Sequence, residues 1–264
     1  MKKRKKSILE TVRRYHELIL FLTYREIRIR YKQTLLGVAW AVLQPLLQMV
    51  VFTFVFFKLG KMQSGEAPYH IFVFSGLLPW ALFAGALSRG VPIIINYPNL
   101  VTKIYFPREI FPIFATLGLL VDFVCSLAVL LVFFFVAGIP FQLGILYGFF
   151  VILIVTIFSI GILFFISTMN VFFRDITYVV PLLSQAWLFM TPVVYPIEKV
   201  PQKFRFWYDL NPMVGLVQAY RDLTLEGHLT NPNLFLQASI ASIIIFYLGY
   251  RYLKHYEMKF ADVI

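Results

Sequence analysis

The sequence has few charged residues, one cysteine and no phosphate-binding loop. Asp, Glu, Lys and Arg make up 14% of the 264 residues, against about 25% in soluble domains. Cys125 stands alone in an apolar segment and says nothing about the redox compartment. No segment matches G-x-x-x-x-G-K-[ST], so the chain lacks the loop that cradles nucleotide phosphates in many ATPases. If the protein carries out active transport, its energy must come from another chain.

Hydrophobic residues take the place of the missing charges. They make up 60% of the chain, and the mean hydropathy is +0.78, which indicates an integral membrane protein. A bilayer core about 30 Å thick requires roughly 20 apolar residues per helical crossing. Six uncharged or nearly uncharged windows meet this length: 37–57, 71–95, 112–136, 143–168, 177–196 and 233–253. We therefore predict an all-α membrane protein with six transmembrane helices.

The six spans leave no room for a second folded domain, because each remaining segment is shorter than about 50 residues. We expect a single membrane domain over 1–264, with a cytoplasmic interface helix in 1–36, the spans in 37–253 and a cytoplasmic tail in 254–264. The opening KKRKK leads into a charged segment, so we expect no cleavable signal peptide.

The net charge of +11 is distributed unevenly, with 11 of the 24 Lys and Arg residues before residue 37. The loops on the same side as this segment are also the more basic ones. By the positive-inside rule we predict a multi-pass membrane protein with both termini in the cytoplasm. Attraction to anionic lipid explains the remaining positive charge, so we expect membrane lipid and no nucleic acid as a partner.

The segment 7–31 has the pattern of an amphipathic helix. Ser7 and Glu10 form a possible capping box. Apolar residues recur at helical spacing on one face: Ile8, Val12, Tyr15, Ile19 and Leu22. Such a helix can lie in the lipid interface, dock a soluble partner, or do both.

Five segments, in order along the chain, resemble ABC-2 type permeases that export polysaccharides. They are REIRIRYKQTLLGVAWAVLQPLLQ at 25–48, KIYFPREIFP at 103–112, NVFFRDI at 170–176, TPVVYP at 191–196 and LNPMVGLVQAYRD at 210–222. One such motif is weak, but five in sequence cover nearly the whole chain.

The resemblance implies a transport subunit of the bacterial plasma (inner) membrane that is not an enzyme. The implied assembly is a homodimer of this chain with a separate cytoplasmic ABC ATPase, and the implied cargo is a lipid-linked polysaccharide, with O antigen favoured. The resemblance implies no cofactor and no metal in this chain, because ATP and Mg belong to the ATPase. A small-drug or lipid exporter of the ABC-2 type, or a membrane-embedded glycolipid transferase, remains an alternative.

The resemblance also assigns an ATPase-coupling role to basic and loop residues on the cytoplasmic side. Pro98 and Pro107 bracket a short helix expected at 98–106. A simple solvated connector is the competing interpretation of this loop, and a topology signal is the competing interpretation of Arg174. The predicted coupling residues are Arg25, Arg28, Arg30, Asn99, Lys103, Arg108, Glu109 and Arg174.

Two spans carry a polar and aromatic face at helical spacing, suited to contact with a sugar chain. The predicted channel-lining residues are Trp40, Gln44, Gln48 and Phe52 in the first span and Ser184, Trp187, Thr191 and Tyr195 in the fifth. Helix packing within the membrane is the competing interpretation. Pro181, Pro192 and Pro196 predict a kinked or broken fifth span.

Two further features carry predictions. Between the fifth and sixth spans, Asn211 and Pro212 begin a helix and Gly227 ends it, so we expect external re-entrant or lid helices resting in the outer interface.

Arg89 and Asp122 are the charges deepest in the spans, within about 6 Å of each other in depth at 1.5 Å per residue. We predict that they form a buried ion pair.

Overall fold

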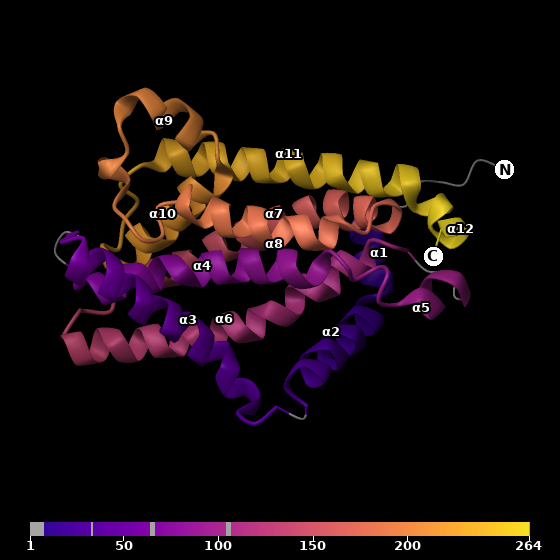
Figure 1. Cartoon of the computed structure of the whole chain (residues 1–264), viewed down its shortest axis with the longest axis horizontal. Coiled ribbons are helices and arrows are strands. Elements are labelled where there is room, and N and C mark those ends of the chain that lie inside the picture. Colours follow the sequence, from indigo (N-terminus) through magenta and orange to yellow (C-terminus); the bar gives the residue numbers. More distant parts are fainter. Residues whose placement is uncertain (1–7, 33, 64–66, 104–106, 264) are drawn as a thin grey trace.

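The computed structural model describes residues 8–32, 34–63, 67–103 and 107–263, and all regular structure in this part of the chain is helical (Figure 1). Ser7 of the predicted capping box lies outside the described residues. Five long helical segments are apolar enough to cross a membrane. They are Gly37–Leu59, which contains α3 (Trp40–Phe52), and α4 (Tyr69–Gly90), α6 (Ile110–Ala137), α7 (Gly144–Phe172) and α11 (Pro232–Tyr256).

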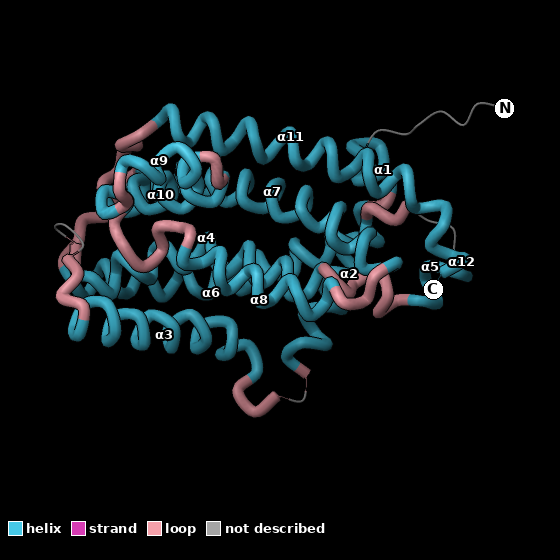
Figure 2. The backbone as a smooth tube through the Cα atoms, turned by 45° about the horizontal axis from the view of Figure 1, so that its top comes forward, coloured by secondary structure: helices cyan, strands magenta, loops and turns pink. Residues whose placement is uncertain are grey.

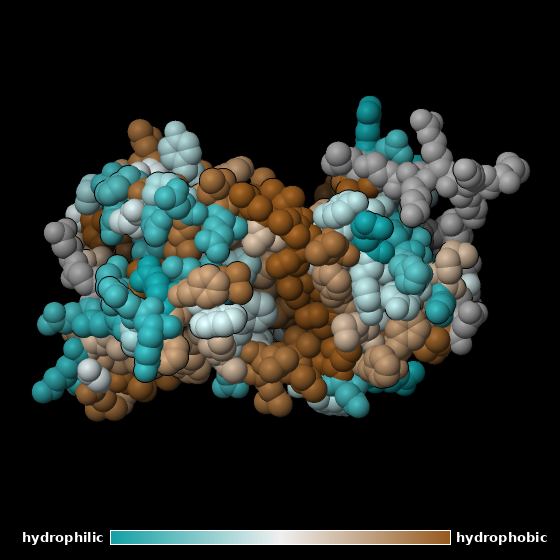
Figure 3. Space-filling view, turned by 90° about the horizontal axis from the view of Figure 1, so that it is seen from above, coloured by the Kyte–Doolittle hydropathy of each residue, from teal (hydrophilic) through white to brown (hydrophobic). Residues whose placement is uncertain are grey.

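Shorter helices cluster at the two ends of the long ones (Figure 2). At one end lie α1 (Ile8–Arg14), α2 (His16–Tyr31), α5 (Pro98–Lys103) and α12 (Phe260–Val263); at the other lie α9 (Gln202–Asp209) and α10 (Pro212–Leu225). The first and last described helices are therefore at the same end of the molecule. Figure 3 shows a hydrophobic band between two more hydrophilic ends, as a membrane-spanning protein requires.

The fifth predicted span is shorter than expected. Its window 177–196 holds α8, which runs from Ile176 to Phe189 and is only 14 residues long. A turn follows at residues 190–194, because Pro192 has no N–H to continue the helix. The prediction of a kinked or broken helix is thus confirmed, while in the described part of the chain five helices and not six have the length of a full crossing.

The carbonyl groups around this break are hydrogen-bonded by side chains. Tyr195 Oη donates to Phe189 O at 2.6 Å, and Asn211 Nδ2 donates to Met190 O at 3.2 Å. Arg221 Nη2 donates to Val193 O at 3.0 Å, and Tyr69 Oη donates to Val194 O at 2.5 Å. Non-helical backbone at membrane depth is tolerated only when such partners exist.

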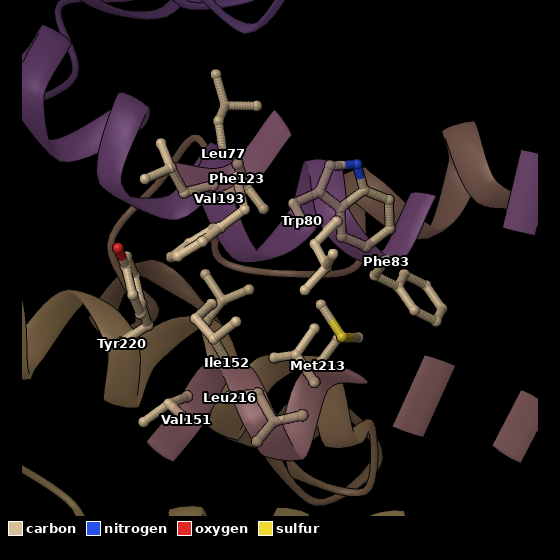
Figure 4. Packing of buried hydrophobic residues seen from close by; sticks show 14 of the residues in the cluster. Leu77, Trp80, Phe83, Phe123, Val151, Ile152, Val193, Met213, Leu216 and Tyr220 are labelled. Carbon is tan, nitrogen blue, oxygen red and sulfur yellow. The ribbon is translucent and has the colours of Figure 1, made fainter. Parts of the chain in front are cut away.

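Helix α10 lies in the core, which corrects the prediction that it rests in the outer interface, while the re-entrant or lid role stays a prediction. Asn211 caps it as expected, accepting a hydrogen bond from Met213 N at 3.1 Å. Its residues 212–217 and 219–224 are buried. Figure 4 shows Met213, Leu216 and Tyr220 of α10 packed with Leu77, Trp80 and Phe83 of α4. Helix α10 packs against α4, α7 and α11, so its apolar residues are buried by protein and not by the lipid interface.

A proline also interrupts the first span. Pro45 lies inside α3 and cannot donate to the carbonyl four residues earlier. That carbonyl, Ala41 O, accepts a hydrogen bond from Ser126 Oγ of α6 at 3.2 Å. The bond joins α3 to α6 where the helix is weakest.

The N-terminal amphipathic helix is divided at Tyr15 into α1 and α2. Helix α2 packs against α6 through Ile19 and Leu22, both of which are 3% exposed. The predicted apolar face is therefore confirmed for these two residues, whereas Val12 is exposed. Thr11 is buried on the same side instead.

Helices α7 and α11 pack closely, because a glycine on each helix faces the backbone of the other. A Cβ at Gly161 would lie 2.7 Å from Phe246 Cα, and one at Gly249 would overlap Gly161 O. Small residues permit such approach between helices in a membrane. The absence of side chains at these two positions thus sets the α7–α11 distance.

We expect Gly249→Leu to lower the free energy of unfolding by about 1–3 kcal/mol, because the added side chain forces the two backbones apart. SDS titration of the purified chain in mixed micelles measures this change. The control is Leu248→Val at the neighbouring, exposed position, where the free energy of unfolding should change by less than about 0.5 kcal/mol. Equal stability of the Gly249 variant and the control would contradict the packing assigned to α7 and α11.

Candidate functional site

A cavity of about 580 Å³ lies among α2, α3, α4, α6 and α8. In Figure 1, the end of α2 and the beginning of α3 approach one another at the lower edge of the molecule. Its lining combines apolar side chains with residues that carry amides, hydroxyls and indole rings and with three charged groups. Five of the predicted channel-lining residues line it: Trp40, Gln44, Gln48, Phe52 and Ser184.

The structure adds polar residues to this cavity that the sequence pattern did not identify. They are Tyr31, Thr34, Ser88, Ser126 and Gln185. Ser88 directly precedes Arg89 in α4, and Ser126 lies four residues after Asp122 in α6, so the charged residue of each helix was a signal that could have indicated them. Gln185 follows Ser184 directly, and its exposure to the same space reflects the position of α8 beside α4.

The other three residues predicted in the fifth span do not line the cavity. Trp187 packs edge-on against Phe83, with ring centroids 5.1 Å apart. Thr191 is buried and donates to Trp187 O at 3.0 Å. Tyr195 lies beyond the break and accepts a hydrogen bond from Tyr208 Oη at 3.2 Å. Because α8 ends at Phe189, the helical spacing that placed these residues on one face does not continue past it.

The partner of Asp122 is Arg30, and not Arg89 as predicted. Arg30 Nη1 lies 2.5 Å from Asp122 Oδ2, and the two side chains are 9% and 19% exposed. Tyr31 Oη donates to Asp122 Oδ1 at 2.5 Å. Burial and the hydrogen bond to Asp122 raise the pKa of Tyr31, which keeps the phenol protonated as a donor. The correction follows from the packing of α2 on α6, which brings a residue from the interface segment to the acid.

A second cavity of about 680 Å³ opens between α2 and the segment that follows α4. Its lining includes the predicted coupling residues Arg25 and Asn99, together with Glu26 and Tyr97. Tyr97 Oη donates to a carboxylate oxygen of Glu26. Burial and this bond raise the pKa of Tyr97. The Arg25 guanidinium lies 5.2 Å from the centre of the Tyr97 ring.

The predicted coupling residues fall into two groups. Arg25, Arg28, Asn99 and Arg174 are exposed and available for contact. Arg108 instead donates to Leu100 O at 3.2 Å and to Val101 O, so it fixes α5. Arg30 is held by Asp122. The side chain of Lys103 lies outside the described part of the chain.

Glu109 cannot be a contact residue as predicted. Its side chain is 0% exposed and forms an ion pair with Lys254, in which Glu109 Oε2 accepts a hydrogen bond from Lys254 Nζ at 2.7 Å. Lys254 also lies 2.9 Å from Glu257. This acid therefore joins the beginning of α6 to the end of α11, a pairing of residues 145 positions apart that sequence spacing does not reveal.

The sequence is similar to a family of known proteins over most of its length. A sequence model described as ABC-2 type transporter matches residues 17–225. The chain is 28% identical over 249 residues to the O-antigen export system permease protein RfbA of Klebsiella pneumoniae, covering 94% of this chain and 95% of that protein. It is 29% identical over 262 residues to the protein of the same name in Myxococcus xanthus, with 95% and 96% covered. It is 23% identical over 238 residues to the polysialic acid transport protein KpsM of Escherichia coli, with 87% and 89% covered.

A double-mutant cycle tests the corrected ion pair. Arg30→Gln and Asp122→Asn should each lower the free energy of unfolding by about 1–3 kcal/mol, because either change leaves a nearly buried partner unpaired. The double variant should lose less than the sum of the two single losses. SDS titration in mixed micelles gives the four values.

The matched control is a second double-mutant cycle, which combines a change at Arg89 with the change at Asp122. Arg89→Gln and Asp122→Asn should have additive effects within about 0.5 kcal/mol, because these residues are not paired. Strong coupling of Asp122 to Arg89 with none to Arg30 would restore the original prediction.

Proposed function

Because the family match covers most of its length, the chain belongs to the ABC-2 type transporter family, and we propose that it is the transmembrane subunit of an ABC transporter that exports a lipid-linked polysaccharide. O antigen is the favoured class of cargo. The observation that carries this proposal is the cavity among α2, α3, α4, α6 and α8, which collects the polar faces of two apolar helices. Hydroxyl and amide groups beside indole rings suit the hydroxyls and apolar faces of sugars.

The names of the relatives support a polysaccharide over other cargoes. Relatives in two bacteria are named as O-antigen export permeases, and a third is named as a polysialic acid transport protein. All three align with most of this chain. The segments that form the cavity lie within residues 17–225, which match the family model.

Two copies of the chain complete the proposed pathway. Gln44, Gln48 and Gln185 line the cavity yet are exposed, although they lie on helices at membrane depth. An amide group facing lipid is costly, whereas helices that face each other satisfy such groups. The first span is also the least buried of the five, with 17% of its most apolar window buried. A homodimer through α3 and α8 would cover these groups and enclose the cargo.

A separate cytoplasmic ATPase provides the energy in this proposal, and it binds the ATP and Mg. The exposed residues Arg25, Arg28, Asn99 and Arg174 and the helix α5 form its docking surface. We place this surface in the cytoplasm and the chain in the bacterial inner membrane with both termini inside. The shared location of α1, α5 and α12 at one end supports this orientation (Figure 1).

The alternatives make different demands on the cavity. An exporter of a small drug or lipid needs the same fold and an apolar pocket, so the cargo test below separates it. A glycolipid transferase needs acids or histidines gathered at one place for acid–base or metal-assisted chemistry. Asp122 is the acid that lines the cavity, and it is already paired with Arg30.

Replacing the cavity amides tests the cargo. We expect Gln44→Leu together with Gln48→Leu to reduce glycan export about tenfold, since each lost hydrogen bond contributes about 1 kcal/mol. Immunoblotting of surface glycan and of lipid-linked glycan retained at the cytoplasmic face measures the loss. The matched control is Val51→Leu, an exposed position on the same helix that lies outside the cavity. Unchanged export in the double variant at normal protein levels would contradict the pathway.

Removing the hydrogen bonds from Arg108 to α5 tests the coupling surface. Arg108→Ala releases the carbonyls of Leu100 and Val101, so we expect α5 to lose its fixed position. Export should fall about tenfold while the ATPase still copurifies, because loss of a charged hydrogen-bond donor costs about 1.5–3 kcal/mol. Lys259→Ala, an exposed change at the same end of the molecule, should preserve export. Full export by the Arg108 variant would contradict a role of α5 in transmitting force.

A further inference from the structure

The two cavities share two residues, Ser88 and Arg89, in the last turn of α4. The first cavity lies among the spans, and the second opens beside α2 and the segment 92–100. Arg89 is exposed where the two spaces meet. Its place in the last turn also suits a cation, because the carbonyl end of a helix carries partial negative charge.

Each other charge in the two cavities has a counterpart or a close polar partner. In the first cavity, the Arg30 and Asp122 side chains form the ion pair at 2.5 Å. In the second, Glu26 accepts a hydrogen bond from Tyr97, and Arg25 lies over the same ring. Among the residues the structure describes, no hydrogen bond or ion pair joins Arg89 to another side chain or carbonyl. Arg89 is therefore the unmatched positive charge at the junction.

We propose that Arg89 binds a phosphate group of an amphiphilic ligand whose polar part occupies the two cavities. A guanidinium binds phosphate oxygens with two parallel N–H groups, and this geometry favours arginine over lysine. Ser88 also lines both cavities, and its hydroxyl is a second donor available to a phosphate there. The assignment rests on the proposed function, in that the ligand is the carrier end of the cargo or a membrane lipid held in its place.

The Arg30–Asp122 pair has a defined part in this site. It removes the charge of one arginine from the first cavity, so a single positive charge remains there at Arg89. The positive charge that attracts a phosphate is therefore confined to Arg89 and is not distributed over several residues of the first cavity. In the second cavity, the negative charge of Glu26 balances the positive charge of Arg25 in the same way.

The test measures binding of dodecyl phosphate to the full chain in phosphatidylcholine nanodiscs. Trp40 and Trp80 line the first cavity, so their fluorescence reports occupancy. Dodecyl glucoside, which has the same alkyl chain and no charge, is the reference ligand. The unaltered protein should bind dodecyl phosphate about tenfold more tightly than the reference, as expected for charge-assisted hydrogen bonds. Equal binding of the two ligands would overturn the proposal without any variant.

Three variants locate the effect. Arg89→Gln should remove the preference for phosphate, and Arg89→Lys should keep part of it, because the charge remains while the two-pronged geometry is lost. Arg251→Gln removes an exposed cation on α11 that lines neither cavity, and it should keep the full preference. A similar loss in the Arg89 and Arg251 glutamine variants would show a surface-charge effect and overturn the site.

A lipid exchange identifies the source of the phosphate. In phosphatidylglycerol nanodiscs, a resident lipid headgroup at Arg89 should weaken dodecyl phosphate binding more in the unaltered protein than in Arg89→Gln. An equal change in both proteins assigns the site to the cargo. Because these measurements need neither export nor ATP, failure of the export tests would leave the phosphate site standing, and failure here would leave the export proposal standing.

Discussion

The satisfaction of backbone groups within the membrane is the constraint on which this structure depends. Helices span lipid because their backbone hydrogen bonds are internal, and each proline interrupts that pattern. At Pro45 the freed carbonyl of Ala41 is taken by Ser126. Around Pro192 the carbonyls are taken by Tyr195, Asn211, Arg221 and Tyr69. Two of these donors, Asn211 and Arg221, belong to α10 and its cap, and they reach the carbonyls because α10 lies in the core. The break after α8 and the position of α10 therefore depend on each other.

A second interaction joins the water-facing part of the chain to the cavity. The Arg30–Asp122 ion pair and the Tyr31 hydrogen bond hold the end of α2 against the middle of α6. Breaking such a nearly buried pair is costly, so α2 and α6 move together. We therefore expect a displacement of α2 to shift α6, which forms a wall of the cavity. The same pair balances one of two cavity arginines and leaves the other, Arg89, to face the interior.

Hydrophobic length and proline positions were sufficient to predict most of the fold. Five windows of roughly 20 apolar residues became helices of the expected position, and the prolines near 192 predicted the break in α8. Asn211 and Pro212 marked the beginning of α10. The position of α10 was not predictable from its own residues, because an amphipathic helix beside a membrane can be buried by protein or by lipid. Which of the two surrounds it depends on helices distant in sequence.

For the site, the sequence by itself determined which residue types line each helix face, including Gln44, Gln48 and Ser184. It also determined that Asp122, an acid within an apolar span, needs a partner. Only the tertiary structure decided which partner: Arg30 lies 92 positions away, and Lys254 lies 145 positions from Glu109. The physical reason is that periodicity describes one helix at a time, whereas ion pairs and cavities depend on how separate helices pack together.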